Sequence, residues 1–409
     1  MRLAPAIGLA AAVLASALPA AGAPSATTPK PPAASAPTTP TPPAASTPAP
    51  VVVQPTGLFG IYEASHDGQW LFGVPDNASY LTPVVLDRAS GTATGQVGGE
   101  AFRITGFVRD NPNLRLEVDS TVPGYEFSAL WLHDLASGAR LRVDTDSTGL
   151  PLFPSWTGPQ GTTQPRIAVS PKSVSQDGAY VAMCVDDAKR IPRLSVKNLV
   201  SGELKATAVR CGVGASGIVR LPEISADGSV VHVNGSVDDV ATTAHPYPSY
   251  VRADRLVFPL GKKVKVRKVQ GWGSMTRNGR TLFMIRGTRA PGARRLAGLV
   301  GAYDIRAGWT RAMAGRWAIY GNNVIANFSA SDKASSNGRY VVYGSKVKVI
   351  DRKKGRKVDL ATPMTAAGYP PSAYVQSRIS GDGRVVFALT TTGASTGFGR
   401  VYVAVTGWR

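Results

Sequence analysis

Short apolar runs separated by turn signals dominate the chain from residue 51 onward. β-Branched and aromatic residues alternate with polar ones in runs such as residues 339–343, RYVVY, and residues 347–351, VKVID. This period of two is typical of half-buried strands. Asn-Gly between such runs predicts a type I′ hairpin turn, in which both central residues have a positive φ. The pattern therefore predicts an all-β chain of short antiparallel strands.

The turn before each run has the form Ser/Thr-x-Asp/Asn-Gly. It recurs at residues 65–68, 175–178, 225–228, 276–279, 335–338 and 380–383, and a degenerate copy, Arg-Asp-Asn-Pro, lies at residues 109–112. We expect the Asp or Asn of each turn to cap that turn by side-chain to backbone hydrogen bonds. These structural turn residues are Asp67, Gly68, Asp177, Gly178, Asp227, Gly228, Asn278, Gly279, Asn337, Gly338, Asp382 and Gly383.

A second motif follows most of these units. It is an apolar alternation that ends in Asp or Asn with a Gly a few residues on, at residues 84–91, 130–138, 194–202, 301–308 and 347–355. Such a motif is typical of a strand that runs into a tight turn. Successive turn signals lie roughly 45 to 65 residues apart, and four strands per unit at such a period indicate propeller blades. We therefore predict a seven-bladed β-propeller of four-stranded antiparallel blades, with a β-sandwich as the alternative.

With both motifs in register, the chain resembles the WD40-like propeller repeat of the TolB kind, which occurs in secreted and periplasmic bacterial proteins. The resemblance covers residues 51–409. This sequence lacks the Pro of the usual Ser-Pro-Asp-Gly turn, and its second copy is degenerate. The resemblance implies that the channel and the loop face of the propeller supply a binding site.

Ring closure can be predicted from the strand count of the last unit. Strands are expected near residues 374–380, 384–390 and 400–406, which leaves this unit one strand short. The early run Val51-Val52-Val53 has no partner in its own unit. We expect it to supply the outer strand of the last blade, because such closure removes exposed strand edges.

The N-terminal residues have the features of a segment for export. Residues 1–23 combine Arg2, an apolar core and small residues before a cleavage site, as in a secretory signal peptide. Residues 24–50 are almost wholly Pro, Ala, Thr and Ser, which predicts a disordered linker before the propeller at residues 51–409. We expect a secreted, monomeric protein, associated with the cell wall, that has no transmembrane span in its mature form.

The net charge of +20 is concentrated in one quarter of the chain. Residues 255–360 hold 24 Lys or Arg and 4 Asp or Glu, which leaves 22 basic and 22 acidic residues elsewhere. Residues 262–268 alternate as in a strand, with Lys263 and Lys265 on one face, and residues 352–357 are expected to form a turn between strands. The candidate binding residues of this basic sector are Lys262, Lys263, Lys265, Arg267, Lys268, Arg352, Lys353, Lys354, Arg356 and Lys357.

Such a sector attracts polyanions. Candidates are phosphate polymers such as teichoic acids, acidic polysaccharide and anionic lipid headgroups. Nucleic acid is disfavoured because the sequence has no RNP, OB or zinc-finger pattern. The alternative is a basic surface that has no dedicated ligand.

No residue is predicted to be catalytic, and no metal or cofactor is expected. The four histidines, His66, His133, His232 and His245, have no metal-ligand spacing. Residues 144–149 resemble a calcium loop only faintly, since Thr148 occupies the third ligand position and no Glu follows at the expected place. The two cysteines, Cys184 and Cys211, are expected either to form one disulfide or to remain buried thiols.

These features predict a non-enzymatic scaffold that binds a protein or an anionic cell-envelope polymer. The competing class is a propeller enzyme, a hydrolase or lyase that acts on extracellular polysaccharide. That class requires a pair of acids or a nucleophile clustered at the channel mouth.

Overall fold

The computed structural model describes most of the chain after residue 52. The described residues are 53–75, 83–94, 102–119, 129–150, 152, 167–189, 191–213, 219–234, 253–261, 263–270, 272–288, 296–308, 310–319, 334–343, 347–370, 377–389 and 401–405. The predicted signal peptide, the predicted linker, His245 and Lys262 lie outside these residues. Within the described ranges, no helix is both long enough and apolar enough to cross a membrane.

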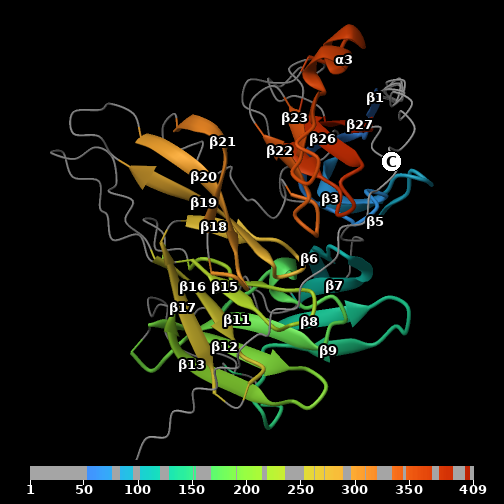
Figure 1. The fold of residues 1–409 in the computed structure, drawn as a ribbon. Coiled ribbons are helices and arrows are strands. Elements are labelled where there is room, and N and C mark those ends of the chain that lie inside the picture. The colour runs from blue at the N-terminus through green and yellow to red at the C-terminus, as the bar shows by residue number, and fades with distance from the viewer. Residues whose placement is uncertain are drawn as a thin grey trace, which may run out of the picture. The chain divides into compact units, whose positions relative to one another are not determined.

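The strands form consecutive antiparallel sheets, each built from a continuous stretch of chain except the last, which also takes in β1 (Figure 1). In the first half of the chain the sheets are β2 (Leu58–Ala64), β3 (Trp70–Pro75), β4 (Val84–Asp87) and β5 (Ala93–Thr94); β6 (Phe102–Val108), β7 (Asn111–Asp119), β8 (Ala129–Asp134) and β9 (Arg140–Arg142); and β10 (Ile167–Ala168), β11 (Tyr180–Asp186), β12 (Pro192–Asn198) and β13 (Leu204–Arg210). A 3₁₀ turn, η1 (Pro171–Ser173), precedes β11.

The same order continues in the second half of the chain. Its sheets are β14 (Glu223–Ile224), β15 (Val231–Val233), β16 (Ala253–Phe258) and β17 (Lys265–Gln270); β18 (Trp272–Met275), β19 (Thr281–Thr288), β20 (Leu296–Asp304) and β21 (Thr310–Ile319); β22 (Tyr340–Tyr343), β23 (Lys348–Asp351) and β24 (Lys357–Asp359); and β25 (Ser377–Ile379), β26 (Val385–Leu389), β27 (Val401–Val405) and β1 (Val53–Pro55). A short helix, α3 (Ala361–Ala366), follows β24.

The prediction of four-stranded antiparallel blades is correct for six sheets. The described residues thus give six four-stranded blades and not the seven predicted, because the sheet β22-β23-β24 has three strands in the described part of the chain. The place of its first strand is marked only by an isolated bridge between Ala334 and Val341, because the residues just before Ala334 are outside the described ranges.

Apolar residues on both faces of a strand explain why the sheets stack against one another. In β11, Val181 and Met183 pack into a core shared with the β6–β9 sheet, whereas Ala182 and Cys184 pack into a core shared with the β14–β17 sheet. Successive strand side chains point to opposite faces, so one strand contributes to two cores. Each sheet is therefore buried on both sides, as in a propeller blade.

The Ser-x-Asp-Gly turn has the same hydrogen bonds in each copy. In the first copy, the Ser65 hydroxyl donates to Asp67 at 2.6 Å, and the backbone N–H groups of Gln69 and Trp70 donate to Asp67 and Ser65. The predicted type I′ turn is wrong, because only the Gly of these turns has a positive φ, and the Asn before it does not. The Ser and Asn side chains instead close a longer loop that needs one left-handed residue.

The turns are also joined to one another in a closed cycle of hydrogen bonds. The joining bonds are His66 N–H to Arg109 O, Asn111 Nδ2 to Gln176 O, Gln176 N–H to Ala226 O, Ala226 N–H to Arg277 O, Asn278 N–H to Ser336 O, Ser336 N–H to Gly381 O and Gly381 N–H to Ser65 O. The cycle includes the degenerate turn and returns to the first turn, so the turns lie together around one interior.

The strand that closes the last sheet comes from the start of the described chain. β1 pairs antiparallel with β27, with Val53 opposite Ala404, and is the outermost strand of the order β25-β26-β27-β1. The predicted closure is therefore confirmed for Val53, whereas Val51 and Val52 lie outside the described residues. The last sheet thus depends on pairing between the two ends of the described chain.

Replacing Gly279 with Ala is expected to destabilise the protein far more than replacing Gly138 with Ala. Both glycines have a φ near +70°, which costs an L side chain about 1–2 kcal/mol. A Cβ on Gly279 would lie 2.7 Å from Ser225 Cβ in the neighbouring blade, whereas one on Gly138 meets nothing within 4 Å. The extra overpacking should cost about 1–3 kcal/mol in urea unfolding. Equal losses for the two variants would contradict this account of the blade contact.

Candidate functional site

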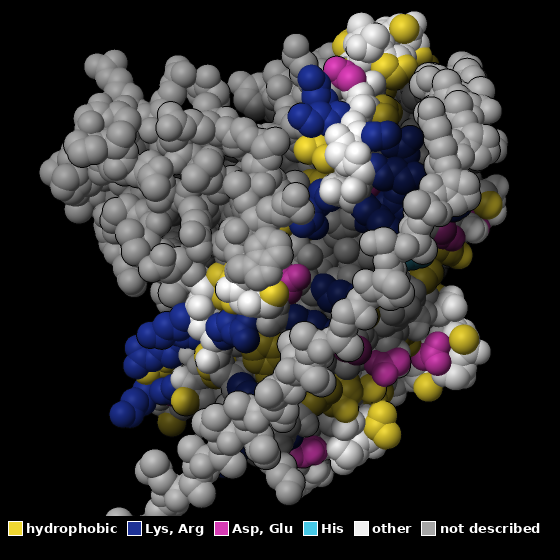
Figure 2. Space-filling view, viewed as in Figure 1, with side chains coloured by type: hydrophobic (Ala, Val, Ile, Leu, Met, Phe, Trp, Pro, Cys, Tyr) yellow, Lys and Arg dark blue, Asp and Glu magenta, His cyan; other side chains and the backbone are white. Residues whose placement is uncertain are grey.

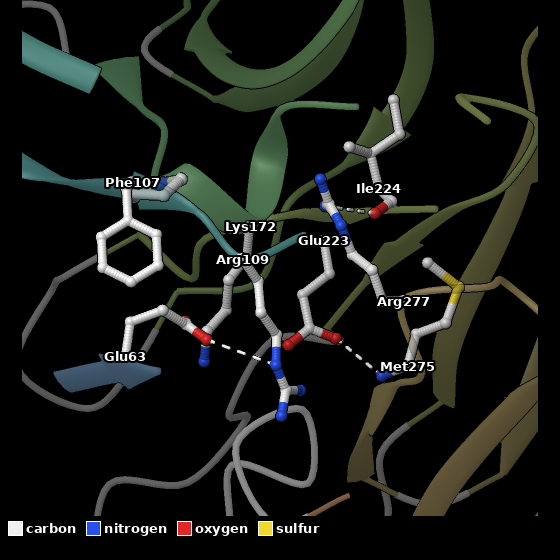
Figure 3. Close-up of a pocket in the computed structure, with 9 residues that line it drawn as sticks. Glu63, Phe107, Arg109, Lys172, Glu223, Ile224, Met275 and Arg277 are labelled. Atoms are coloured by element: carbon white, nitrogen blue, oxygen red, sulfur yellow. Dashed lines mark hydrogen bonds and ion pairs between the residues drawn. The ribbon is translucent and has the colours of Figure 1, made fainter. Parts of the chain in front are cut away.

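A small cavity lies where the inner strands and the turns meet (Figure 3). Its volume is about 20 Å³, which is room for about one water molecule. Charged side chains dominate the residues that line it, which are Glu63, Phe107, Arg109, Pro171, Lys172, Glu223, Ile224, Met275 and Arg277. The site therefore brings together charges from blades that are far apart in the sequence.

The degenerate turn supplies two of the charged groups that reach across the interior. Arg109 Nε lies 3.7 Å from Glu63 Oε1, and Arg109 Nη2 donates to the carbonyl of Ile379 in β25. Asp110 Oδ1 accepts hydrogen bonds from His66 Nδ1 at 3.2 Å and from the Ser336 hydroxyl at 2.7 Å. This turn thus ties its own sheet to three others.

Arg277 makes the corresponding connection on the other side of the cavity. Its Nη1 donates to Ile224 O at 3.2 Å, and its Nη2 donates to Val174 O at 2.6 Å (Figure 3). Burial lowers the pKa of Arg277, but an arginine stays protonated in proteins. Its guanidinium is therefore a buried charge that fastens the β18–β21 sheet to two earlier sheets.

Glu223 is held in place by donors from two sheets. Ser274 Oγ donates to Glu223 Oε1 at 2.5 Å, and the N–H of Met275 donates to Oε2 at 2.7 Å. His232 Nδ1 lies 3.2 Å from Oε2. Burial alone would raise the pKa of Glu223, but the hydrogen bond and charge of His232 and the charge of Lys172 outweigh it, so the pKa is lowered.

His232 lies between two carboxylates and is fully buried. Its second ring nitrogen, Nε2, lies 2.9 Å from Asp254 Oδ2, which also accepts the N–H of Gly273. Ionised carboxylates only accept hydrogen bonds, so both ring nitrogens must donate, and the ring is an imidazolium. Burial by itself would lower the pKa of His232, but Asp254 and Glu223 raise it to about 9.

The carboxylates of this cluster are poor candidates for a general acid. Burial opposes ionisation of Asp110, but the hydrogen bonds from His66 and Ser336 lower its pKa. Glu223 is shifted in the same direction. A glycosidase acid needs a raised pKa and room for a sugar beside it. The geometry instead suits a network in which opposite charges neutralise one another and join the blades.

The basic sector falls on two separate hairpins, over β17 and over β22 and β23 in Figure 2. β17 begins only at Lys265, so Lys263 lies in the preceding turn and the predicted strand over residues 262–268 is too long. Lys263, Lys265, Arg267 and Lys268 are exposed. The β18–β21 sheet separates this hairpin from residues 352–357 in the order of the sheets.

Residues 352–356 form the turn between β23 and β24, as the sequence pattern indicated, and Lys357 begins β24. Lys353, Lys354, Arg356 and Lys357 are exposed. Arg352 instead donates to Gly338 O at 2.7 Å and lies 5.0 Å from the ring centroid of Phe283 in the neighbouring blade. Arg352 therefore has a packing role between blades.

Carboxylates accompany the cations of this second hairpin. Arg339 donates to Asp351 at 2.8 and 3.1 Å, and Lys348 lies 3.8 Å from Asp359. The hydrogen bond from Arg339, with those from two backbone N–H groups, lowers the pKa of Asp351 to about 2. The hairpin thus carries its own counter-charges.

The cysteines and the aspartates of the possible calcium loop make structural contacts. Cys184 and Cys211 are joined in a disulfide. Asp144 pairs with Arg142 at 2.8 Å, and Asp146 accepts N–H groups of its own turn, so these side chains do not converge on a calcium site. Among the described residues, no group of three or more His, Cys, Asp or Glu could hold a metal ion.

Sequence analysis missed the charged cavity, although a positional signal exists. Glu63 and Glu223 each lie two residues before the Ser of a turn, and the side chain at this position of the repeat is buried at Glu63 and mostly buried at Glu223. Arg109 replaces the Ser or Thr that begins each of the other turns, and Asp110 and Arg277 are the charged residues at the second turn position. A charged residue at an inward position of a repeat is the feature that could have identified the cluster.

No protein-family model matches the chain, and no curated protein matches it. Solved structures do match. One is a putative TolB from Agrobacterium tumefaciens, with 15% identity, a TM-score of 0.36, and coverage of 62% of this chain and 79% of that chain. Another is an oligogalacturonate lyase from Vibrio parahaemolyticus, with 13% identity, a TM-score of 0.49, and coverage of 88% and 92%.

A third match is the β-propeller domain of the Trilobed protease from Pyrococcus furiosus, with 12% identity, a TM-score of 0.41, and coverage of 69% of this chain and 76% of that chain. These likenesses concern the fold. The matched structures thus include a TolB protein and a β-propeller domain, and the sheet order and the cycle of turns show that this chain is a β-propeller.

Proposed function

We propose that this β-propeller is an exported, non-enzymatic scaffold that binds an anionic polymer of the cell envelope through its exposed basic side chains. The observation that carries the proposal is how the charged side chains inside the propeller are bonded and how little space lies between them. These charged side chains are held by ion pairs and by hydrogen bonds to hydroxyl and carbonyl groups of other strands, and the cavity has a volume of only about 20 Å³. Binding is therefore assigned to the outer surface.

Export is supported by the disulfide between Cys184 and Cys211. Disulfides form and persist in oxidising compartments and are rare in the cytosol. The expected signal peptide at residues 1–23 fits the same location. We place the propeller outside the cell, tethered by residues 24–50, and we propose that it acts as a monomer in which the β22–β24 sheet serves as the seventh blade.

An anionic polymer is favoured over a protein partner by the excess of positive charge. A field of one sign attracts any polyanion and speeds its capture at low salt. A protein partner would require a cluster of apolar anchors, whereas the exposed apolar side chains of the β16–β17 hairpin, Leu260 and Val266, stand among cations.

The alternative is a hydrolase or lyase acting on polysaccharide, because Glu63 and Glu223 both line the cavity. The donors around Glu223 argue against it, since they stabilise the ionised form. If the wild-type protein cleaves polysaccharide and the Glu223→Gln variant does not, the enzyme is favoured over the scaffold.

Binding to an immobilised anionic envelope polymer tests the scaffold directly. A variant with Lys263, Lys265, Lys268, Lys353, Lys354, Arg356 and Lys357 replaced by Gln should bind more than about tenfold more weakly at 0.1 M salt, since each cation near an anionic surface contributes on the order of 1 kcal/mol. Arg267 and Arg352 are left intact because they contact neighbouring blades.

The control replaces exposed cations outside the basic sector, namely Arg140, Lys189, Arg210 and Arg384, by Gln. It should bind nearly as wild type does. The proposal would be overturned if the variant with all seven cations replaced bound as tightly as wild type. It would also be overturned if wild type did not bind even at low salt.

A further inference from the structure

The outer hairpin of the fourth sheet, β16–β17, carries a group of cations without counter-charges. The group consists of Arg255, Lys263, Lys265, Arg267 and Lys268. Within the described part of the chain, none of the five makes an ion pair with a carboxylate. On the β23–β24 hairpin, carboxylates lie among the cations, because Asp351 pairs with Arg339 and Asp359 with Lys348, whereas Lys353, Lys354 and Lys357 make no ion pair within the described residues.

Two of these cations face each other directly. Arg255 in β16 and Lys268 in β17 are opposite residues of an antiparallel pair. Side chains at such positions have Cβ atoms about 5 Å apart, and like charges there destabilise the sheet. A bound anion would relieve this repulsion.

The strand itself is accessible along its length. β17 is the last strand in the order β14-β15-β16-β17, and Lys265, Val266, Arg267 and Lys268 are all exposed. Residues two apart on one face of a strand are separated by about 7 Å. Lys265 and Arg267 share one face of β17 and Lys268 lies on the other, so a linear polymer lying along this edge could meet cations from both faces.

The two arginines are already engaged by neighbouring blades. Arg267 Nη1 donates to Ile305 O at 2.6 Å and lies 3.3 Å from Tyr303 OH, and Arg255 Nη1 lies 3.4 Å from Arg210 O. Planar, bidentate arginine forks recognise carboxylates and phosphates alike, and here neither fork is left for a ligand. The groups left for a ligand are three lysine ammonium groups, which bind phosphate as point charges.

Resting on the proposed function, we infer that the β16–β17 hairpin is the binding site and that its ligand is a linear polymer of phosphodiester units. Lys265 and Lys268 contact phosphates from the two faces of this edge strand, and Lys263 contacts one from the turn before it, with Arg255 adding to the field. The β23–β24 hairpin contributes only a long-range charge.

Two matched variants separate the hairpins. One replaces Lys263, Lys265 and Lys268 by Gln, and the other replaces Lys353, Lys354 and Lys357 by Gln. With purified poly(glycerol phosphate) as the probe, the first variant should bind at least about tenfold more weakly than the second. Its slope of log Kd against log salt should also shrink by about two to three units, whereas the slope of the second should change little.

Polygalacturonate of equal charge and single-stranded DNA are the comparison probes. Tighter binding of polygalacturonate than of poly(glycerol phosphate) would overturn the phosphodiester assignment, and tighter binding of DNA would overturn the envelope polymer. If both triple variants weaken binding equally, the hairpin assignment fails while the proposed function stands. If the variant with all seven cations replaced also binds as wild type does, the proposed function itself fails.

A further readout distinguishes binding from protection of the strand edge. Lysines on an edge strand can serve only to prevent pairing with another chain. In that case the first triple variant would self-associate in size-exclusion chromatography, and its monomer would bind the polymer with wild-type affinity. A monomeric variant with weakened binding is the result expected from the inference.

Discussion

Replacing Arg277 with Met is expected to lower the free energy of unfolding by about 3–5 kcal/mol. Arg277 is buried and donates to carbonyl oxygens of Val174 and Ile224, which belong to the two preceding blades. Met has a similar length but no donor, so both carbonyls lose this partner. The buried carboxylates Glu63 and Asp110 would also lose a compensating charge. Urea unfolding followed by circular dichroism measures the loss.

Two further variants define the cause of this loss. Arg277→Lys keeps the charge, but one ammonium group cannot replace a fork that reaches two carbonyls, so we expect a smaller but clear loss. Arg306→Met changes an exposed arginine and should stay within about 0.5 kcal/mol of wild type. An Arg277→Met protein as stable as the Arg306→Met protein would show that the crossing arginine does not hold the blades together.

Raising the pH from 6 to 10 is expected to remove stability on the order of 3 kcal/mol through His232 alone. The pKa of His232 is raised from 6.5 to about 9 in the folded protein, so the folded state binds this proton more tightly than the unfolded state does. The contribution is therefore complete below pH 6.5 and is lost as the pH rises through 9. Unfolding free energies measured across this range test the sign as well as the size.

The matched variants for this prediction are His232→Gln and His66→Gln. His232→Gln should be less stable at pH 6, because Glu223 and Asp254 lose the charge between them, and it should lose most of the pH dependence between 6.5 and 9. The pKa of His66 is also raised, through its hydrogen bond to Asp110, but this side chain is 55% exposed and solvent screens its pairing. His66→Gln should keep the slope, and a flat profile in wild type would contradict the assigned imidazolium.

Much of the fold could be predicted from local patterns. The strands around residues 339–343 and 347–351, the Gly355 turn between strands and the pairing of Val53 with the last sheet all follow from alternation, turn chemistry and strand counting. These features depend on neighbours in the sequence or on a simple count. The type I′ turn was wrong because the Ser and Asn side chains form hydrogen bonds within the loop, which the Asn-Gly pair alone does not indicate.

The candidate site was far less predictable. Arg109 bonds to the carbonyl of Ile379, Asp110 to Ser336, and Arg277 to Val174, and each pair is widely separated in the sequence. No local pattern encodes such contacts, because they depend on which side chains face the interior after the blades have closed. The same limit applies to Arg352, which belongs to a basic run but lies over Phe283.

The sequence by itself determined the repeated four-stranded unit, the turn residues that end its strands and the concentration of positive charge in one quarter of the chain. Periodicity and turn chemistry act over a few residues, so they can be identified without coordinates. Only the tertiary structure decided that buried charges from several blades neutralise one another around a cavity of about 20 Å³, and that the lysines of β17 have no acidic partner among the described residues. Both depend on distances between side chains of different blades, and the closed cycle of turns sets those distances.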